Sequence, residues 1–264
     1  MNFSSPHSIR IQIMWENYRQ QIVDHFPKPP GLPKHPDKYL EHVLEVYVQD
    51  AYHSLSIEGY RVSRELIEKV RNNSWQPDQH AVDRQENDAL AARGYYEAFL
   101  AVKESVSKIL QGESSSEVVL QDHSKWFQKL FAPSVRAGIL SSADLFGYRR
   151  HQVYIRGSRH TPLAKEYLNE AMQTFFFLLE KEEHAGVRAV LGHFIFEYIH
   201  PYMDGNGRIG RFLMNAMMAS GGYPWTIIEV TRREEYLRSL EAASVGSNIV
   251  PLTQFIASFI KNEN

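Results

Sequence analysis

Apolar and polar residues follow a helical period along most of the chain. Apolar side chains recur at intervals of three and four residues, which places them on one face of an α-helix. The pattern predicts an almost entirely helical protein, with two closing helices after the helices expected over roughly 8–24, 40–58, 63–70, 81–110, 122–130, 163–182, 187–199 and 205–217.

Two segments break this period. Residues 27–36 are rich in proline and predict a stiff, extended connector. Residues 147–162 alternate apolar and polar positions around a Gly-Ser pair, which predicts a short β-hairpin. We therefore divide the chain into an N-terminal helix with its connector (1–37), a helical segment (38–62) and a core (63–264).

The composition is typical of a globular protein, with 43% hydrophobic and 23% charged residues. The absence of cysteine excludes disulfides, thiol nucleophiles and thiolate zinc sites. The first residues lack the basic and apolar regions of a signal peptide, and Phe175–Leu179 is too short an apolar run to span a bilayer. A net charge of −2 offers no general attraction for nucleic acid. We therefore expect a cytoplasmic protein with neither membrane nor direct nucleic-acid binding.

The most informative segment runs from His200 to Arg211 and reads His-Pro-Tyr-Met-Asp-Gly-Asn-Gly-Arg-Ile-Gly-Arg. Buried helices flank it, so it predicts a helix–loop–helix whose second half opens a helix. A helix N-terminus presents free N–H groups to an anion, and Gly205 and Gly207 let the backbone approach that anion. Arg208 and Arg211 are three residues apart on the polar side of this helix, so both can reach the same anion.

Two further residues of the segment supply reactive chemistry. Asp204 lies just before the loop, where a carboxylate and phosphate oxygens would hold Mg²⁺. His200 closes the preceding helix, and near neutral pH its imidazole can take a proton from an attacking hydroxyl. Each residue singly also fits an ordinary capped turn, but a plain turn needs neither two glycines around Asn206 nor two aligned arginines. The segment predicts a site that grips a polyphosphate and deprotonates a group beside it.

This segment resembles the signature of the Fic family, His-Pro-Phe-x-(Asp/Glu)-Gly-Asn-Gly-Arg-x-x-Arg, with Tyr202 in place of the phenylalanine. The resemblance spans about 38–260 and implies a Fic-type helical bundle. It also implies transfer of AMP from ATP to a Ser, Thr or Tyr hydroxyl of a protein, self-modification included. The implied roles are His200 as base, Asp204 as ligand of Mg²⁺ or Mn²⁺, and a phosphate-binding set formed by Gly205, Asn206, Gly207, Arg208 and Arg211.

A second motif resembles the inhibitory sequence of the same family, (Ser/Thr)-x-x-x-Glu-(Gly/Asn), in Ser54, Glu58 and Gly59. Glu58 ends an amphipathic helix, where the macrodipole disfavours a negative charge by about 0.3–1 kcal/mol unless a cation is near. The resemblance nominates Arg211 as that cation. It implies that Glu58 occupies the place of the ATP γ-phosphate and keeps the protein inactive. From the residues alone, Gly59 is equally an ordinary helix-ending glycine.

Two weaker features complete the resemblance. The expected hairpin matches a family flap beside the active-site helix–loop–helix that docks the target segment by strand addition, through Val153, Tyr154 and Ile155. Tyr236 matches an aromatic residue on the adenine side. Leu237 and Ser244 depart from the Tyr and Asn expected there, which leaves the nucleobase less certain than the phosphates.

Three other functions stay open at this point. Glu197 and His200 have the Glu-x-x-His spacing of di-iron bundles, but we find no second such motif. The chain could hold ATP as a non-catalytic sensor, or it could remove AMP from a modified protein with Glu58 positioning a water. The sequence does not identify the target protein, the oligomeric state (a homodimer is one option), or whether UMP, GMP or phosphocholine replaces AMP.

Overall fold

The computed structural model describes residues 5–75 and 83–260, and in these residues the regular elements are helices, with no β-strand. In chain order they are α1 (Pro6–His25), α2 (Pro36–Glu45), α3 (Tyr47–Ile57), α4 (Arg64–Arg71), α5 (Asp83–Leu110), α6 (Ser115–Arg136), η1 (Ser142–Leu145), η2 (Lys165–Tyr167), α7 (Leu168–Lys181), α8 (Ala185–Ile199), α9 (Asn206–Ala219), η3 (Val230–Arg232), α10 (Arg233–Ser244) and α11 (Val250–Ala257).

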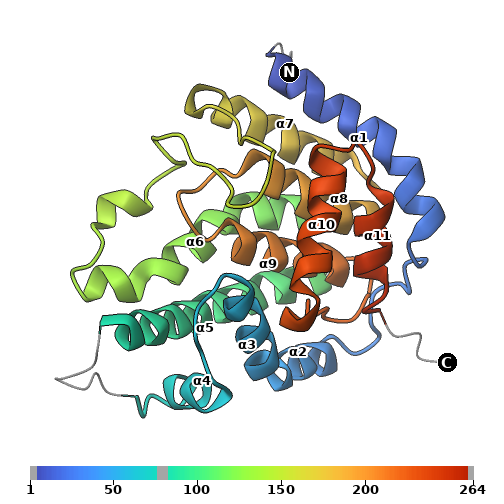
Figure 1. Cartoon of the computed structure of the whole chain (residues 1–264). Helices are drawn as coiled ribbons and strands as arrows, with labels where there is room; N and C mark the ends of the chain where they lie inside the picture. Colours follow the sequence, from blue (N-terminus) through green and yellow to red (C-terminus); the bar gives the residue numbers. More distant parts are fainter. Residues whose placement is uncertain (1–4, 76–82, 261–264) are drawn as a thin grey trace.

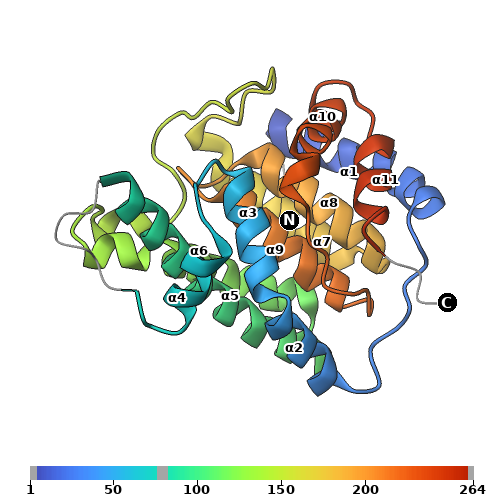
Figure 2. The ribbon, with the colours of Figure 1, turned by 60° about the horizontal axis from the view of Figure 1, so that its bottom comes forward.

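Helices α8 and α9 form the centre of the bundle (Figure 1). Nearly every residue of both helices is buried, so neither has the polar stripe of a surface helix. Helices α1, α7, α10 and α11 pack against α8, and α5 and α6 pack against α9. Figure 2 shows α2, α3 and α4 along one side of this bundle, where all three contact α5. The loop between α8 and α9 is therefore held on a rigid, fully packed pair.

Several predicted boundaries shift in the structure. The helix predicted over 40–58 is two helices, because Val46 forms a turn between α2 and α3. Helix α6 is longer than the predicted 122–130, since it begins earlier, at Ser115 in a run of serines. Serine is common both in turns and at helix starts, so its presence did not decide where the helix begins.

The hairpin predicted over 147–162 is wrong, because the structure shows an extended loop without strand pairing. Side chains hold this loop instead of a backbone ladder. The Gln152 amide donates to the Pro162 carbonyl at 2.9 Å, across ten residues, and closes the loop. Alternating apolar residues predict an extended backbone, but they do not decide whether a neighbouring strand is present to pair with it.

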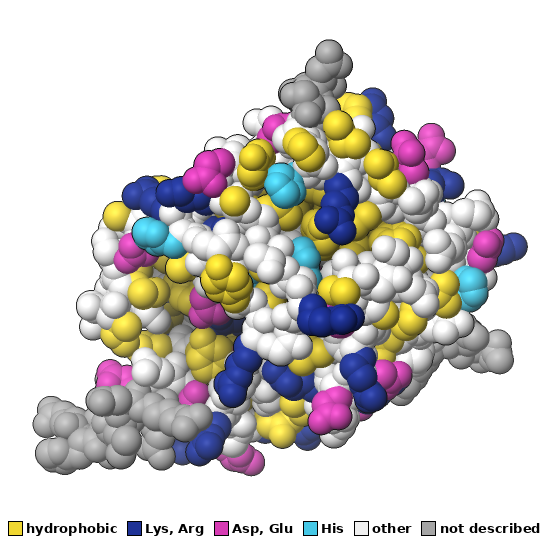
Figure 3. All heavy atoms as spheres, turned by 45° about the horizontal axis from the view of Figure 1, so that its top comes forward, with side chains coloured by type: hydrophobic (Ala, Val, Ile, Leu, Met, Phe, Trp, Pro, Cys, Tyr) yellow, Lys and Arg dark blue, Asp and Glu magenta, His cyan; other side chains and the backbone are white. Residues whose placement is uncertain are grey.

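The surface carries mixed charge. On the face shown in Figure 3, basic and acidic side chains are scattered among apolar and neutral ones. Within residues 5–75 and 83–260, no helix is both long and apolar enough to cross a membrane.

Gly94 lets α5 and α6 approach each other closely. A Cβ on this residue of α5 would lie 1.8 Å from the Leu130 carbonyl oxygen of α6, and neither backbone can yield. In an open helix, Gly→Ala usually stabilises by roughly 0.5–1 kcal/mol. We expect Gly94→Ala to lower the free energy of unfolding by about 1–3 kcal/mol, measured by urea denaturation. A rise in the urea midpoint would contradict this packing.

Candidate active site

The loop between α8 and α9 is shaped by its own residues. His200 ends α8 in the left-handed conformation (φ +54°), and Gly205 takes φ +81° immediately before α9. The Asn206 side chain holds the loop through two hydrogen bonds to the backbone of Tyr202. Its oxygen accepts from the Tyr202 N–H at 2.9 Å, and its nitrogen donates to the Tyr202 carbonyl at 2.8 Å. Asn206 is buried, so its side chain shapes the loop, while the first backbone N–H groups of α9 have no partner within their own helix.

His200 is held through its ring and through its backbone. Its Nδ1 lies 3.3 Å from the Glu197 carbonyl oxygen, and because a carbonyl only accepts, Nδ1 carries the proton. The Nε2 lone pair is then the one available to take a proton. Arg149, which the sequence did not single out, donates its Nε to the His200 carbonyl at 2.8 Å and its backbone N–H to the Pro201 carbonyl at 2.9 Å. Burial lowers the pKa of His200 to about 4, so the ring is neutral at neutral pH.

Arg208 lies inside the protein and not on a solvated helix face. Its guanidinium carbon is 5.2 Å from the ring centroids of both Tyr60 and Phe131, and the side chain is fully enclosed. Its Nη2 donates to Asp204 Oδ1 at 3.2 Å. Asp204 is itself largely exposed. The aromatic partners come from distant parts of the chain, which is why local spacing placed Arg208 on the polar side.

Arg211 is bound by the end of α3. It donates Nε to the Ser54 hydroxyl at 2.9 Å and Nη2 to the Ser54 carbonyl at 3.0 Å. Nη2 also pairs with Glu58 Oε1 at 2.7 Å. Gly59, at φ +92°, follows Glu58 and ends the helix. The ion pair between Glu58 and Arg211 therefore joins the two motifs that the sequence singled out.

The Glu58 carboxylate lies over the first turn of α9. A Cβ on Gly207 would be 2.2 Å from Glu58 Oε1, so only a glycine leaves room for the carboxylate there. Arg233 donates Nε to the Ile57 carbonyl at 2.7 Å, which holds the end of α3 in this position. The acidic group thus sits where the helix N-terminus and Arg211 together favour an anion.

A buried polar cluster lies behind this ion pair. Tyr236, expected on the adenine side, is buried, and its hydroxyl lies 2.8 Å from His193 Nε2. Glu197 lies near both, and burial followed by the charge of Glu58 raises its pKa to about 8. No group of three or more His, Asp or Glu among the described residues is arranged to hold a metal ion.

The extended loop that replaces the predicted hairpin runs beside α8 and α10. Its Ser158 hydroxyl and Arg159 N–H donate to the Glu241 carboxylate, at 2.5 and 2.9 Å. His160 Nε2 lies 2.8 Å from the Tyr198 carbonyl oxygen. Between these anchors and Gln152 lie the three expected docking residues, of which Tyr154 is 78% exposed and Val153 and Ile155 are partly buried.

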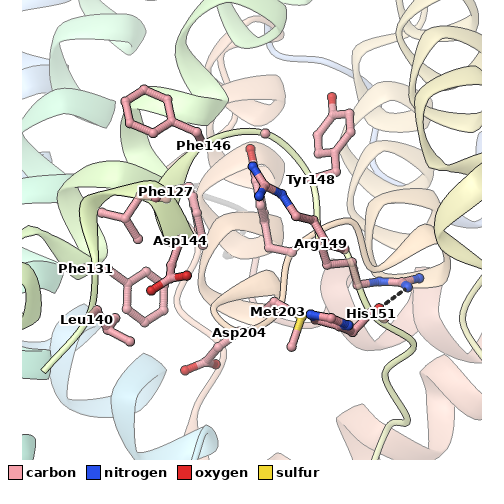
Figure 4. A pocket seen from close by; sticks show the side chains of 15 residues that line it. Phe127, Phe131, Leu140, Asp144, Phe146, Tyr148, Arg149, His151, Met203 and Asp204 are labelled. Atoms are coloured by element: carbon pink, nitrogen blue, oxygen red, sulfur yellow. Dashed lines mark hydrogen bonds between the residues drawn. The ribbon is translucent and has the colours of Figure 1, made fainter.

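A cavity of about 390 Å³ lies beside the α8–α9 loop, which contributes Tyr202, Met203 and Asp204 to its lining (Figure 4). Its walls are formed by α6, by η1 and the residues that follow it up to 151, and by residues 202–204 of the α8–α9 loop. Charged and titratable side chains of both signs line part of it, namely Asp144, Arg149, Arg150, His151 and Asp204. The rest of the lining is mostly aromatic and aliphatic: Phe127, Phe131, Leu140, Leu145, Phe146, Tyr148, Tyr202 and Met203. The cavity shares Asp204 with the candidate site and is large enough for one or two bulky side chains.

The fold and the site together define a helical bundle in which one loop carries a histidine at its start and leads into a helix N-terminus at its end. The model of the Fic/DOC family matches residues 114–218, which run from α6 through the His200–Arg211 segment. The chain belongs to the Fic/DOC family.

Named relatives agree with this assignment. The chain is 30% identical, over 217 residues, to the protein adenylyltransferase Fic of Drosophila virilis, and 31% identical to that of Drosophila grimshawi. Each match covers 81% of this chain but 41% of the relative, so the chain spans about two fifths of these relatives' length.

Solved structures confirm the predicted Fic-type helical fold. A fragment of Fic-1 from C. elegans superposes with a TM-score of 0.67 at 21% identity, covering 96% of this chain and 70% of that one. A Fic-domain signaling protein from Bacteroides thetaiotaomicron gives a TM-score of 0.63 at 15% identity, covering 94% and 91%.

Proposed function

We propose that this chain transfers AMP from ATP to a hydroxyl side chain of a protein, itself included, and that Glu58 inhibits the transfer. The observation that carries the proposal is the Glu58 carboxylate, which lies over Gly207 and pairs with Arg211 at 2.7 Å. A carboxylate that lies over a helix N-terminus and pairs with an arginine supports binding of an anion at this position. A nucleotide phosphate has the same requirements.

In this proposal the chain's own residues bind, orient and deprotonate. Arg211 and the first N–H groups of α9 bind the phosphates once Glu58 withdraws, and Arg208 keeps Asp204 in place through its 3.2 Å contact. His200 Nε2 takes the proton from the target hydroxyl, and the hydroxyl oxygen bonds to the α-phosphorus. The bond from that phosphorus to the bridging oxygen breaks, and pyrophosphate leaves.

The donor set at Asp204 fits Mg²⁺ or Mn²⁺. The side chain is 61% exposed, and its two hydrogen bonds, from the Gly205 N–H and from Arg208, both reach Oδ1. Oδ2 is thus left for a cation that phosphate oxygens and water would also coordinate. When bound, such a cation offsets the charge on the phosphates.

The target segment is proposed to lie along Val153, Tyr154 and Ile155. Their backbone is extended and, among the described residues, unpaired with any strand, so an incoming segment could add to it. The exposed Tyr154 ring would contact that segment first.

Labelled ATP distinguishes this function from its alternatives. We expect the Glu58→Gly protein with Mg²⁺ to acquire label from [α-³²P]ATP and none from [γ-³²P]ATP. Label from the γ-phosphate would instead show phosphoryl transfer. A protein that binds ATP but takes up neither label would be a sensor. Release of AMP from a previously modified protein, lost in Glu58→Ala, would show removal of AMP.

A further inference from the structure

Glu197 is a buried carboxyl group that the proposed function does not use. It lies on α8 one turn before His200, and its Oε2 is 3.9 Å from His200 Nδ1. The Glu197 backbone oxygen lies 3.3 Å from the same nitrogen. His200 has the left-handed conformation at the end of the helix, and its imidazole lies against the last helical turn. Both acceptors therefore face the proton-bearing side of the ring.

The second carboxyl oxygen of Glu197 is enclosed and has no hydrogen-bond partner among the described residues. The side chain is 13% exposed, and a Cβ on Gly210 of α9 would lie 2.4 Å from Oε1. Burying a carboxyl oxygen without a partner destabilises a protein by about 1–3 kcal/mol, so packing alone would favour an apolar residue here. A glycine on α9 opposite this carboxyl group provides the room for it.

Charged and titratable groups from four helices face Glu197. These groups are His193 and His200 of α8, Arg211 of α9, Glu58 of α3 and Tyr236 of α10. Burial and then Glu58 raise the pKa of Glu197 to about 8, while Arg211 acts in the opposite direction. Loss of Glu58 therefore favours the carboxylate form.

To act as a base, His200 needs a nearby carboxylate that stabilises its protonated form. Burial lowers its pKa to about 4, so the same burial that keeps the ring neutral also destabilises the positive charge it gains on accepting a proton. A general base works best when its pKa is near the working pH. A carboxylate on the Nδ1 side stabilises the protonated ring and fixes its orientation.

We propose that Glu197 is a positioning residue that holds His200 from its Nδ1 side and stabilises the charge that the imidazole gains. The inference rests on the proposed function of His200 as the base. In the step, the hydroxyl O–H bond breaks and its electron pair stays on oxygen. A new N–H bond forms at Nε2, Nδ1 keeps its proton, and the Glu197 carboxylate stays ionised.

The first test measures AMP transfer against pH in the Glu58→Gly protein. We expect the rate to rise with pH as Glu197 ionises, with a midpoint at or below about 8, because removing Glu58 removes one cause of the raised pKa. Glu197→Gln should remove that rise and reduce the rate at pH 8 by roughly 10–100-fold, with KM for ATP nearly unchanged. Glu183→Gln, an exposed glutamate beside α8, is the control.

The second test does not depend on activity. Ring ¹⁵N shifts of His200 in the full-length wild-type chain should show a titration step near pH 8, and Glu197→Gln should abolish it. The proposal would be overturned if the His200 imidazole of the wild-type chain showed no such step. It would also be overturned if Glu197→Gln left the pH–rate profile unchanged. If the step is present but no variant transfers AMP, the proposed function fails and the coupling of Glu197 to His200 stands.

Discussion

Glu58→Gly is expected to raise AMP transfer by about 10- to 150-fold over the wild-type chain. In the proposed function, Glu58 competes with the nucleotide for Arg211, with which it pairs, and for the first turn of α9, over which it lies. Hydrogen bonds to charged groups are worth about 1.5–3 kcal/mol, which corresponds to that range. Intact-mass spectrometry after incubation with ATP and Mg²⁺ measures the fraction of chains that carry an AMP adduct.

The substitution should not disturb the rest of α3. Ser54 still binds Arg211, and Arg233 still binds the Ile57 carbonyl, so the end of the helix keeps two of its contacts. Glu45→Gly is a matched control, because Glu45 also ends a helix but its side chain is 75% exposed. Equal adduct levels in the wild-type, Glu58→Gly and Glu45→Gly proteins would refute inhibition by Glu58.

His200→Ala is expected to lower AMP transfer by roughly 10²–10⁴-fold in the Glu58→Gly background. The alanine removes the lone pair that is proposed to take the hydroxyl proton, but it leaves Arg211 and the start of α9 intact. We therefore expect ATP binding to change little while the adduct disappears. Equilibrium dialysis with ATP and intact-mass spectrometry of the same preparation check the two halves of this prediction.

A distant histidine provides the comparison for His200. His42→Ala removes an exposed imidazole from α2 and should leave adduct formation unchanged. Circular dichroism confirms that each variant retains its helices. If Glu58→Gly/His200→Ala formed adduct as fast as Glu58→Gly, another group would have to be the base.

The sequence by itself determined the helical class and the position of the candidate site. The apolar spacing in α8 and α9 is local, because residues three and four apart lie on one face of a helix in any fold. For the same reason the loop between these helices could be predicted from residues 200–211 alone. The Ser54–Glu58 motif could also be singled out locally, although its contact with Arg211 spans 153 residues.

The tertiary structure decided which partners the side chains have. Local spacing placed Arg208 on the polar side of its helix, yet Tyr60 and Phe131 enclose it. Alternation predicted a hairpin at 147–162, yet no strand among the described residues lies beside this segment, and side chains such as Gln152 hold it.

Arg149 and Glu197 show most clearly that the local sequence does not determine the partners of a side chain. Arg149 reaches the His200 carbonyl across 51 residues, so no local pattern marks it. Glu197 is only three residues from His200, yet its burial depends on Gly210 of the facing helix. Helical period is a property of the chain itself. Burial and pairing depend on which surfaces meet, and here the packing of α9 against α8 and of α3 over its first turn decided them.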